Sequence, residues 1–143
     1  MSDKTFVDTN ILIYAHDADA GDKQRVAARV LEDLWESRLG VISTQVLQEF
    51  YVNVTRKIAR PVERSVAREI VRAYGAWQLE RPGRDEILHA SELEQRYRLQ
   101  FWDALIVATA IAGGASVLLS EDFFHGRRVA GIVIRNPFLE ERT

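Results

Sequence analysis

The stretch from Trp102 to Asp122, WDALIVATAIAGGASVLLSED, says most about the fold. Its first half, Trp102 to Ala112, is apolar on nearly every face at helical spacing, which predicts a helix that is buried all round. After Gly113-Gly114, the segment Ser116 to Leu119 is rich in Val and Leu without alternation, which is typical of a strand covered on both faces. A buried helix followed by a buried strand indicates an α/β domain.

The rest of the chain continues this alternation. Further strands are predicted at Thr5 to Val7, Val41 to Ser43, Ala76 to Leu79 and Gly131 to Ile134. Further helices are predicted at Lys23 to Arg38, at Val46 to Ile58, in a segment opened by Pro61 and capped by Gly75, and at about Asp85 to Arg98. Strands separated by helices of this length predict a parallel sheet with right-handed crossovers. Because we find no repeat, linker or low-complexity tract, we expect one domain over residues 1–143.

The composition excludes several classes of protein. With 143 residues, 47% of them hydrophobic and 28% charged, the chain is typical of a soluble globular domain. The absence of Cys and the presence of only three His exclude thiolate metal sites, iron–sulfur clusters and Cys nucleophiles, so any metal ion must be held mainly by carboxylates. The longest apolar run, Ala104 to Leu119, is too short to span a bilayer, and no signal segment is visible. We therefore expect a cytoplasmic protein without membrane contact.

Four carboxylates fall at or near one edge of the predicted sheet. Asp8 follows the first strand, Asp122 comes shortly after the strand that ends at Leu119, Glu49 lies on the helix after the second strand, and Asp103 is the only charged residue of the buried helix. In α/β domains with an open parallel sheet, ligands bind outside the carboxyl ends of the strands. Carboxylates gathered there repel one another unless a cation compensates them. We expect Mg²⁺ or Mn²⁺, which prefer oxygen ligands and suit hydrolysis of phosphodiesters.

Each acid taken alone also has a structural interpretation. Asp8 could cap a helix, Asp103 could complement a helix dipole, and the other two could be ordinary helix and loop acids. Glu121, beside the last of the four, is expected to face solvent. For His16 and His125 we favour surface or hydrogen-bonding roles over metal ligation.

Four motifs that contain these acids resemble those of the PIN-domain ribonucleases. They are Phe6-Val7-Asp8-Thr9-Asn10, Gln48-Glu49-Phe50, Phe101-Trp102-Asp103-Ala104-Leu105-Ile106 and Leu119-Ser120-Glu121-Asp122-Phe123. Their order and spacing cover almost the whole chain. Within this family the chain is most similar to the VapC-type toxins of bacterial toxin–antitoxin pairs.

The resemblance implies a three-layer α/β/α fold around a central parallel sheet, and a Mg²⁺- or Mn²⁺-dependent endoribonuclease activity that inhibits translation and growth. It implies four catalytic, metal-binding carboxylates, Asp8, Glu49, Asp103 and Asp122. It also implies three polar side chains that support them, Thr9, Asn10 and Ser120, the last standing where many relatives carry Thr. A cognate VapB-type antitoxin, an RNA substrate and a homodimer are the expected partners.

Other functions remain to be weighed. A response-regulator receiver needs paired acids after the first strand and a Lys late in the sheet, whereas the lysines here are Lys4, Lys23 and Lys57. A phosphatase of the haloacid dehalogenase type needs Asp-x-Asp, whereas this chain has Asp8-Thr9-Asn10. Two alternatives stay open: a PIN ribonuclease that processes RNA outside a toxin pair, and a catalytically silent PIN-like binding module.

Basic residues are frequent between positions 56 and 72, where the sequence has six basic residues and two acidic ones. Arg64, Arg68 and Arg72 recur every four residues and form an exposed stripe, which either follows RNA phosphates or is a solvated helix face. Arg127 and Arg128, after the last motif, are a second candidate RNA contact. The net charge of −2 becomes +2 when the four pocket acids are set aside, so the rest of the chain is compatible with RNA.

Overall fold

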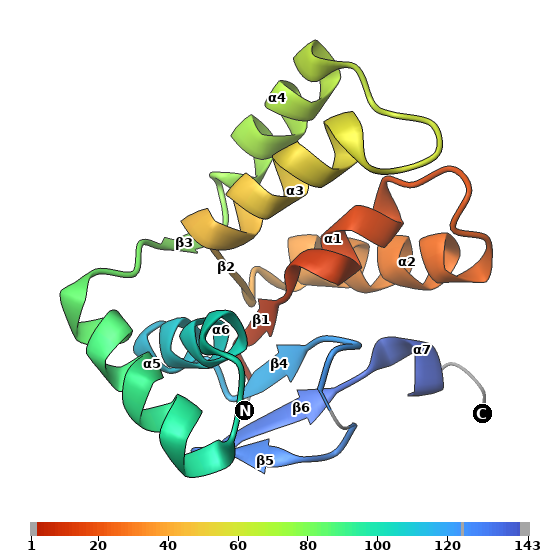
Figure 1. The fold of residues 1–143 in the computed structure, drawn as a ribbon. Helices are drawn as coiled ribbons and strands as arrows, with labels where there is room; N and C mark the ends of the chain where they lie inside the picture. The colour runs from red at the N-terminus through yellow and green to blue at the C-terminus, as the bar shows by residue number, and fades with distance from the viewer. Residues whose placement is uncertain (1–2, 124, 141–143) are drawn as a thin grey trace.

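Strands and helices alternate along the chain, as the hydrophobic pattern predicts (Figure 1). The computed structural model describes residues 3–123 and 125–140. In chain order the elements are β1 (Thr5–Val7), α1 (Thr9–Ala15), α2 (Asp22–Ser37), β2 (Gly40–Ser43), α3 (Thr44–Arg56), α4 (Arg64–Tyr74), β3 (Gln78–Glu80), α5 (Arg84–Tyr97), α6 (Phe101–Ala112), β4 (Val117–Leu119), β5 (Arg128–Val129), β6 (Ile132–Arg135) and α7 (Pro137–Glu140). In these residues, no helix is both long enough and apolar enough to cross a bilayer.

The central strands of the sheet pair in parallel. Within the described residues the sheet has six strands in the order β3-β2-β1-β4-β6-β5. Phe6 of β1 pairs with Val41 of β2 on one side and with Leu118 of β4 on the other. The edge strand β5 runs antiparallel to β6. The predicted parallel sheet is therefore confirmed, apart from this edge strand, whose two residues are too few to show a period.

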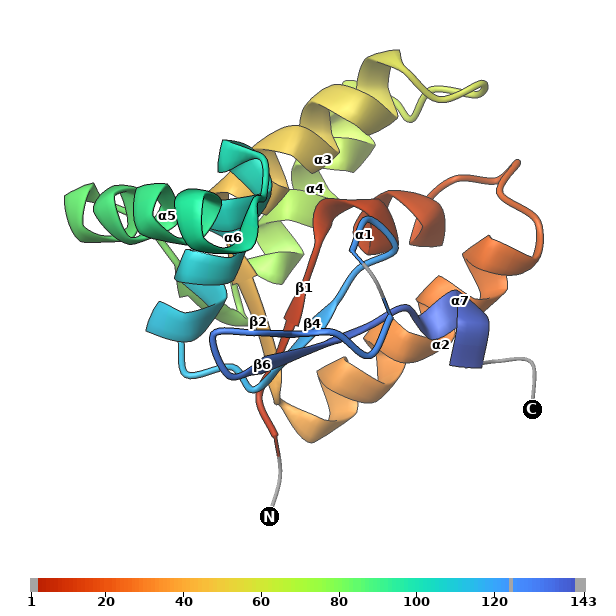
Figure 2. The same cartoon turned by 60° about the horizontal axis from the view of Figure 1, so that its bottom comes forward.

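Helices cover both faces of the sheet, which confirms the predicted α/β/α arrangement. Figure 2 shows α5 and α6 on one side of the sheet and α2 with α7 on the other. The strands between them are apolar on both faces: Phe6, Val7, Val41 and Ile42 are all fully buried. Burial on both sides is the reason these strands lack an alternating pattern.

The helix α6 is buried along most of its length, but not in its first turn. Ala104 to Ala110 are buried, as predicted. Trp102 is 63% exposed and Ala112 is also exposed, so the expectation that the helix is buried all round from Trp102 to Ala112 is wrong at both ends. In the first turn, Phe101 still packs against the core, whereas Trp102 points away from it.

Two helix starts differ from the sequence-based expectations. The short helix α1 was not predicted, because seven residues give a weak period, although Asp8 before it is a typical N-cap. The helix α4 begins at Arg64 and not at Pro61. The backbone N–H of Val62 donates to the carbonyl of Val54 in α3 at 2.8 Å, which holds this segment against α3 before the new helix starts.

Polar residues lie at the carboxyl ends of β1, β2 and β4. Asp8 follows β1, and its backbone N–H donates to the carbonyl of Leu119 in β4 at 2.9 Å. Ser43 ends β2 and caps α3 by accepting a hydrogen bond from the N–H of Val46 at 3.2 Å. Ser120 follows β4. These short connections bring α1, α3 and the loop after β4 to one edge of the sheet.

Candidate functional site

Asp8 is the most deeply buried acid at this edge, with 5% of its surface exposed. One carboxylate oxygen accepts a hydrogen bond from the N–H of Thr9 at 2.7 Å, and the other accepts one from the Ser120 hydroxyl at 2.6 Å. Burial raises the pKa of Asp8 to about 7, although both hydrogen bonds lower it; the charges of Asp122 and Asp103 raise it further. Asp8 therefore acts both as a helix cap and as a carboxylate in need of a counter-charge.

Glu49 is held at both carboxylate oxygens. The Thr9 hydroxyl donates to Oε1 at 2.6 Å, and the Gln45 amide donates to Oε2 at 3.3 Å. Thr9 thus contacts two of the predicted acids, one through its backbone and one through its side chain. Gln45 was not singled out from the sequence, although its position one helical turn before Glu49 on α3 is a signal for this contact.

Asp103 lies half-buried in the first turn of α6. Burial raises its pKa, and the nearby charges of Asp122 and Glu49 raise it further. Asp122 is exposed on the loop after β4. These mutual effects link all four predicted carboxylates, so the structure brings them within electrostatic range of one another.

Ser120 connects three parts of this site. Its hydroxyl donates to Asp8, and its oxygen accepts hydrogen bonds from the backbone N–H of Asp122 at 3.1 Å and from the amide of Asn10 at 3.5 Å. The predicted supporting residues therefore all contact the acids or their loop. The hydroxyl fixes where the loop leaves β4.

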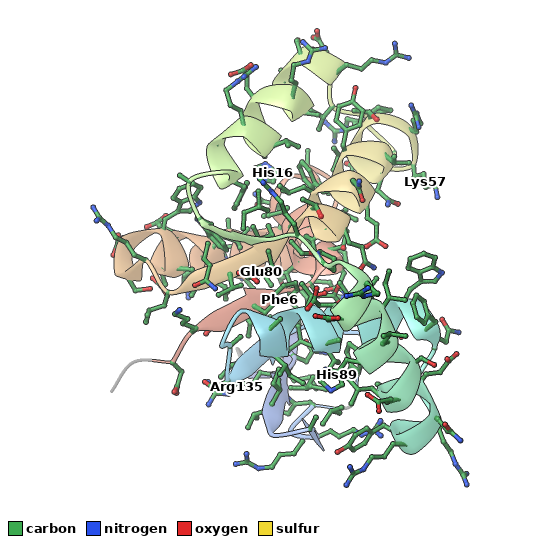
Figure 3. The ribbon with its side chains drawn as sticks, turned by 90° about the vertical axis from the view of Figure 1, so that its left-hand side faces the viewer. Phe6, His16, Lys57, Glu80, His89 and Arg135 are labelled. Carbon is green, nitrogen blue, oxygen red and sulfur yellow. The ribbon has the colours of Figure 1, made fainter. Side chains whose placement is uncertain are left out.

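Two open grooves meet at Asp122. The larger, of about 780 Å³, is bordered by Arg98, Leu99, Gln100, Asp103, Glu121, Asp122, Phe123 and Arg127. The other, of about 530 Å³, is bordered by Thr9, Asn10, Ile13, Gln48, Glu49, Val52, Asn53, Lys57 and Asp122. Figure 3 shows Lys57 at the end of α3. The grooves form a surface on which an extended anionic ligand can lie across the acids.

The donor set fits a hard divalent cation. Among residues 3–123 and 125–140, no three His, Asp or Glu side chains come close enough together to enclose an ion. Mg²⁺ does not need such a cage, because it keeps several waters and takes one or two carboxylates. Four coupled oxygen donors, with the pKa values of Asp8 and Asp103 raised by burial and mutual repulsion, suit an ion bound in this way.

Glu121 does not face solvent, so that expectation is wrong. Its carboxylate accepts a hydrogen bond from the Tyr14 hydroxyl and forms an ion pair with Lys23 at 2.8 Å. His16 packs edge to face on Phe50 at 5.4 Å between ring centroids. Figure 3 shows His16 and His89 well apart, on different elements.

The family model of the PIN domain matches residues 5–125 of this chain. The chain belongs to the PIN-domain family. Comparison with curated proteins gives no match. PIN-domain nucleases generally use divalent metal ions, and the oxygen donors described above agree with that chemistry.

Solved structures share the fold of this PIN domain at low sequence identity. A toxin–antitoxin complex from Klebsiella pneumoniae matches with a TM-score of 0.66 and 22% identity, over 93% of this chain and 97% of the other. VapC20 of Mycobacterium tuberculosis, described as a sarcin–ricin loop cleaving toxin, matches with a TM-score of 0.63 and 23% identity, over 80% and 86%. VapBC2 of Rickettsia felis, bound to a promoter DNA fragment, matches with a TM-score of 0.65 and 19% identity, over 92% and 97%.

The predicted arginines of the PIN domain lie in different surroundings. Arg127 borders the larger groove and donates to the Tyr97 carbonyl at 3.2 Å, which orients it beside the acids. Arg128 is exposed on β5. In the α4 stripe, Arg72 pairs with Glu69 at 3.2 Å.

The other stripe residues differ again. Arg68 borders a mainly apolar groove between α3 and α4, whereas Arg64 is exposed at the start of α4. Arg98 and Lys57, which also border the two acidic grooves, were not identified as groove residues from the sequence, because α5, α6 and α3 bring them there only after folding.

We expect Asp8→Asn to change how the stability of the metal-free protein depends on pH. The folded pKa of about 7 lies above the ordinary value of 3.8, so the folded protein holds this proton more tightly than the unfolded chain does. The contribution of Asp8 to stability is therefore fully present below 3.8 and is lost as the pH rises to about 7. Asn carries no such charge.

Urea unfolding in EDTA measures this effect. Relative to the variant, the wild type should lose about 3 kcal/mol of unfolding free energy between about pH 5 and about pH 8. Parallel curves for the two proteins would mean that Asp8 ionises without a desolvation penalty.

Proposed function

We propose that this PIN domain is a Mg²⁺- or Mn²⁺-dependent endoribonuclease and the toxin of a type II toxin–antitoxin pair. The observation that carries the proposal is the set of four electrostatically coupled carboxylates at the carboxyl edge of the sheet of a PIN domain. The similarity in fold to VapC20, described as a sarcin–ricin loop cleaving toxin, supports RNA as the substrate. Cleavage of RNA would inhibit translation and growth.

The four acids have distinct proposed roles. Asp8 and Asp103, whose pKa values are raised by burial, hold the metal ion most directly, and Glu49 and Asp122 complete its surroundings or orient water. When bound, the ion lowers the pKa of a water molecule and neutralises charge on the attacked phosphate. Ser120 and Thr9 hold the carboxylates of Asp8 and Glu49 in fixed orientations. Hydrolysis adds the water across one P–O bond and leaves a phosphate end and a hydroxyl end.

The basic residues beside the acids are the proposed RNA contacts. Arg98 and Arg127 flank Asp103 and Asp122 in the larger groove, and Lys57 borders the smaller one. Phosphates on either side of the cleaved bond can lie against these cations while that bond faces the acids. The exposed Arg64, Arg68, Arg72 and Arg128 are proposed to add weaker, more distant contacts.

The proposed partners are a VapB-type antitoxin and a second copy of this chain. Similar chains occur in a toxin–antitoxin complex from Klebsiella pneumoniae and in VapBC2 of Rickettsia felis, which supports an antitoxin partner. We also propose a cytoplasmic location, where translation takes place. A ribonuclease that processes RNA outside a toxin pair is the alternative function, and the growth test below separates the two.

Asp103→Asn is the sharpest test of the activity. Loss of one carboxylate from the metal site should lower the rate of Mg²⁺-dependent RNA cleavage by roughly 100-fold or more, while the fold is retained. The measurement is cleavage of structured RNA by the purified protein with Mg²⁺ or with EDTA, and circular dichroism checks the fold. Undiminished cleavage in EDTA, or by the variant, would contradict a metal-dependent site at these acids.

Induced expression in bacteria tests the toxin role. The wild type should arrest growth, Asp103→Asn should not, and co-expression of the product of a neighbouring short reading frame should relieve the arrest. Metal-dependent cleavage without growth arrest would favour a role in RNA processing.

Arg127→Gln should weaken RNA binding and reduce the slope of log K against log salt by about 1, because one phosphate contact is lost. Arg72→Gln is the matched control, since Arg72 already pairs with Glu69 on an exposed helix face. Binding of uncleaved RNA to the Asp103→Asn background at several salt concentrations measures both effects. Equal effects of the two arginine changes would mean that the larger groove is not the main RNA path.

A further inference from the structure

We propose that Lys23, Tyr14 and Glu121 form a clamp that positions the loop carrying Ser120 and Asp122 for binding of the divalent ion. The effect of the clamp on metal binding rests on the proposed function. The clamp itself does not. None of the three residues is proposed to touch the ion or the RNA. They are positioning residues that act through the loop.

Both carboxylate oxygens of Glu121 are occupied by groups from two different helices. Tyr14 of α1 donates its hydroxyl hydrogen to Oε1, and Nζ of Lys23 in α2 lies 2.8 Å from Oε2. The side chain of Glu121 is 21% exposed and that of Lys23 is 45% exposed. The partners lie about a hundred residues apart in the sequence, so the contact joins the loop after β4 to the N-terminal helices.

Aromatic rings hold Lys23 in place. Its Nζ lies 4.9 Å from the ring centroid of Tyr14 and 5.3 Å from that of Phe138 in α7. Tyr14 and Phe138 pack edge to face, with centroids 5.3 Å apart. The views agree that α7 lies near α2, and the two helices are in contact (Figures 1 and 2). A cation fixed by two rings and a carboxylate has little freedom, unlike the cation of an ordinary surface ion pair.

The clamp acts on the middle of a short loop that is anchored at Ser120 and at Phe123, whose side chain is buried in the hydrophobic core. Ser120 is tied to β6 by its backbone N–H, which donates to the Arg135 carbonyl at 3.0 Å. Beyond Ser120, the N–H of Glu121 donates to the Asn10 side chain at 3.4 Å, which is a long hydrogen bond. Among the described residues, no side chain donates a hydrogen bond to the carboxylate of Asp122. The backbone N–H of Asp122 donates to the Ser120 hydroxyl, and the clamp holds Glu121 between these two residues, so both contacts set where that carboxylate lies.

The clamp also controls charge at the site. Glu121 borders the same groove as Asp103 and Asp122, so a free Glu121 would add a further negative charge beside them. Pairing with Lys23 neutralises that charge and points both oxygens toward α1 and α2. The clamp thus keeps Glu121 from competing with Asp122 for the ion.

Lys23→Met tests the clamp by whether it weakens or tightens the binding of Mn²⁺. Removing a positive charge near an acidic site should, by electrostatics alone, tighten binding of Mn²⁺. Loss of positioning should instead weaken it, by roughly tenfold, as for other residues that orient metal-binding groups. Equilibrium binding of Mn²⁺, followed by electron paramagnetic resonance, measures the dissociation constant without RNA.

Arg25→Met is the matched control. It removes the same charge from the same helix, and within residues 3–123 and 125–140 the partner of Arg25 is Asp22, in an exposed pair at 3.0 Å. Binding of Mn²⁺ should be unchanged or slightly tighter in this variant. Lys23→Arg, which keeps the charge and can bond Glu121, should restore most of the wild-type affinity. Equal or tighter binding by Lys23→Met would overturn the proposed link between the clamp and the ion.

Hydrogen exchange tests the clamp independently of metal binding. In the metal-free full-length protein, Lys23→Met and Tyr14→Phe should each speed amide exchange in a peptide covering residues 119–123 severalfold, whereas Arg25→Met should not. Unchanged exchange would overturn the clamp itself. If the variants exchange faster but the wild type neither binds Mn²⁺ nor cleaves RNA, the clamp is supported and the proposed function is rejected.

Discussion

The structure of this PIN domain is organised around the buried carboxylate of Asp8. Asp8 ends the central strand β1, begins α1 and contacts Ser120 at the end of β4. Its burial raises its pKa to about 7, and Asp122 and Asp103 add to that shift. The hydrogen bonds from Thr9 and Ser120 offset only part of the cost of burying this negative charge. The donor groups at this edge of the sheet suit a divalent ion, and the hydroxyls of Ser120 and Thr9 orient the acids.

The charges of the molecule are separated in space in a way that the net charge of −2 conceals. The four acids gather at the carboxyl edge of the sheet, and Arg98, Arg127 and Lys57 border the grooves that meet there. Glu121 joins the same region, but Lys23 neutralises it. An ion bound among the acids would leave a neutral to basic surface along both grooves. Such a surface can hold a polyanion, which the uncompensated acids alone would repel.

The acids could be placed from the sequence because each lies at a short, fixed offset from a strand or helix end. Asp8 directly follows β1. The backbone hydrogen bonds of the parallel sheet then bring it beside the end of β4, independently of side-chain packing. The partners of Glu121 could not be predicted, because they depend on how α1 and α2 pack across a long sequence separation. The start of α4 was misplaced because the backbone N–H of Val62 donates to the carbonyl of Val54 in α3, a contact between segments that a helical period does not reveal. Local patterns thus predicted the longer elements and the positions of the acids, but not the short elements α1, β5 and α7 or the contacts between helices.

The central claim is that the coupled acids form a site for one or more hard divalent ions. Anomalous scattering from crystals soaked in Mn²⁺ at neutral pH tests it most directly, because the manganese signal locates the ion without assuming its ligands. We expect a peak between Asp8 and Asp103, within reach of Asp122 directly or through water. An absence of signal there at saturating Mn²⁺, or a peak only elsewhere on the surface, would contradict it.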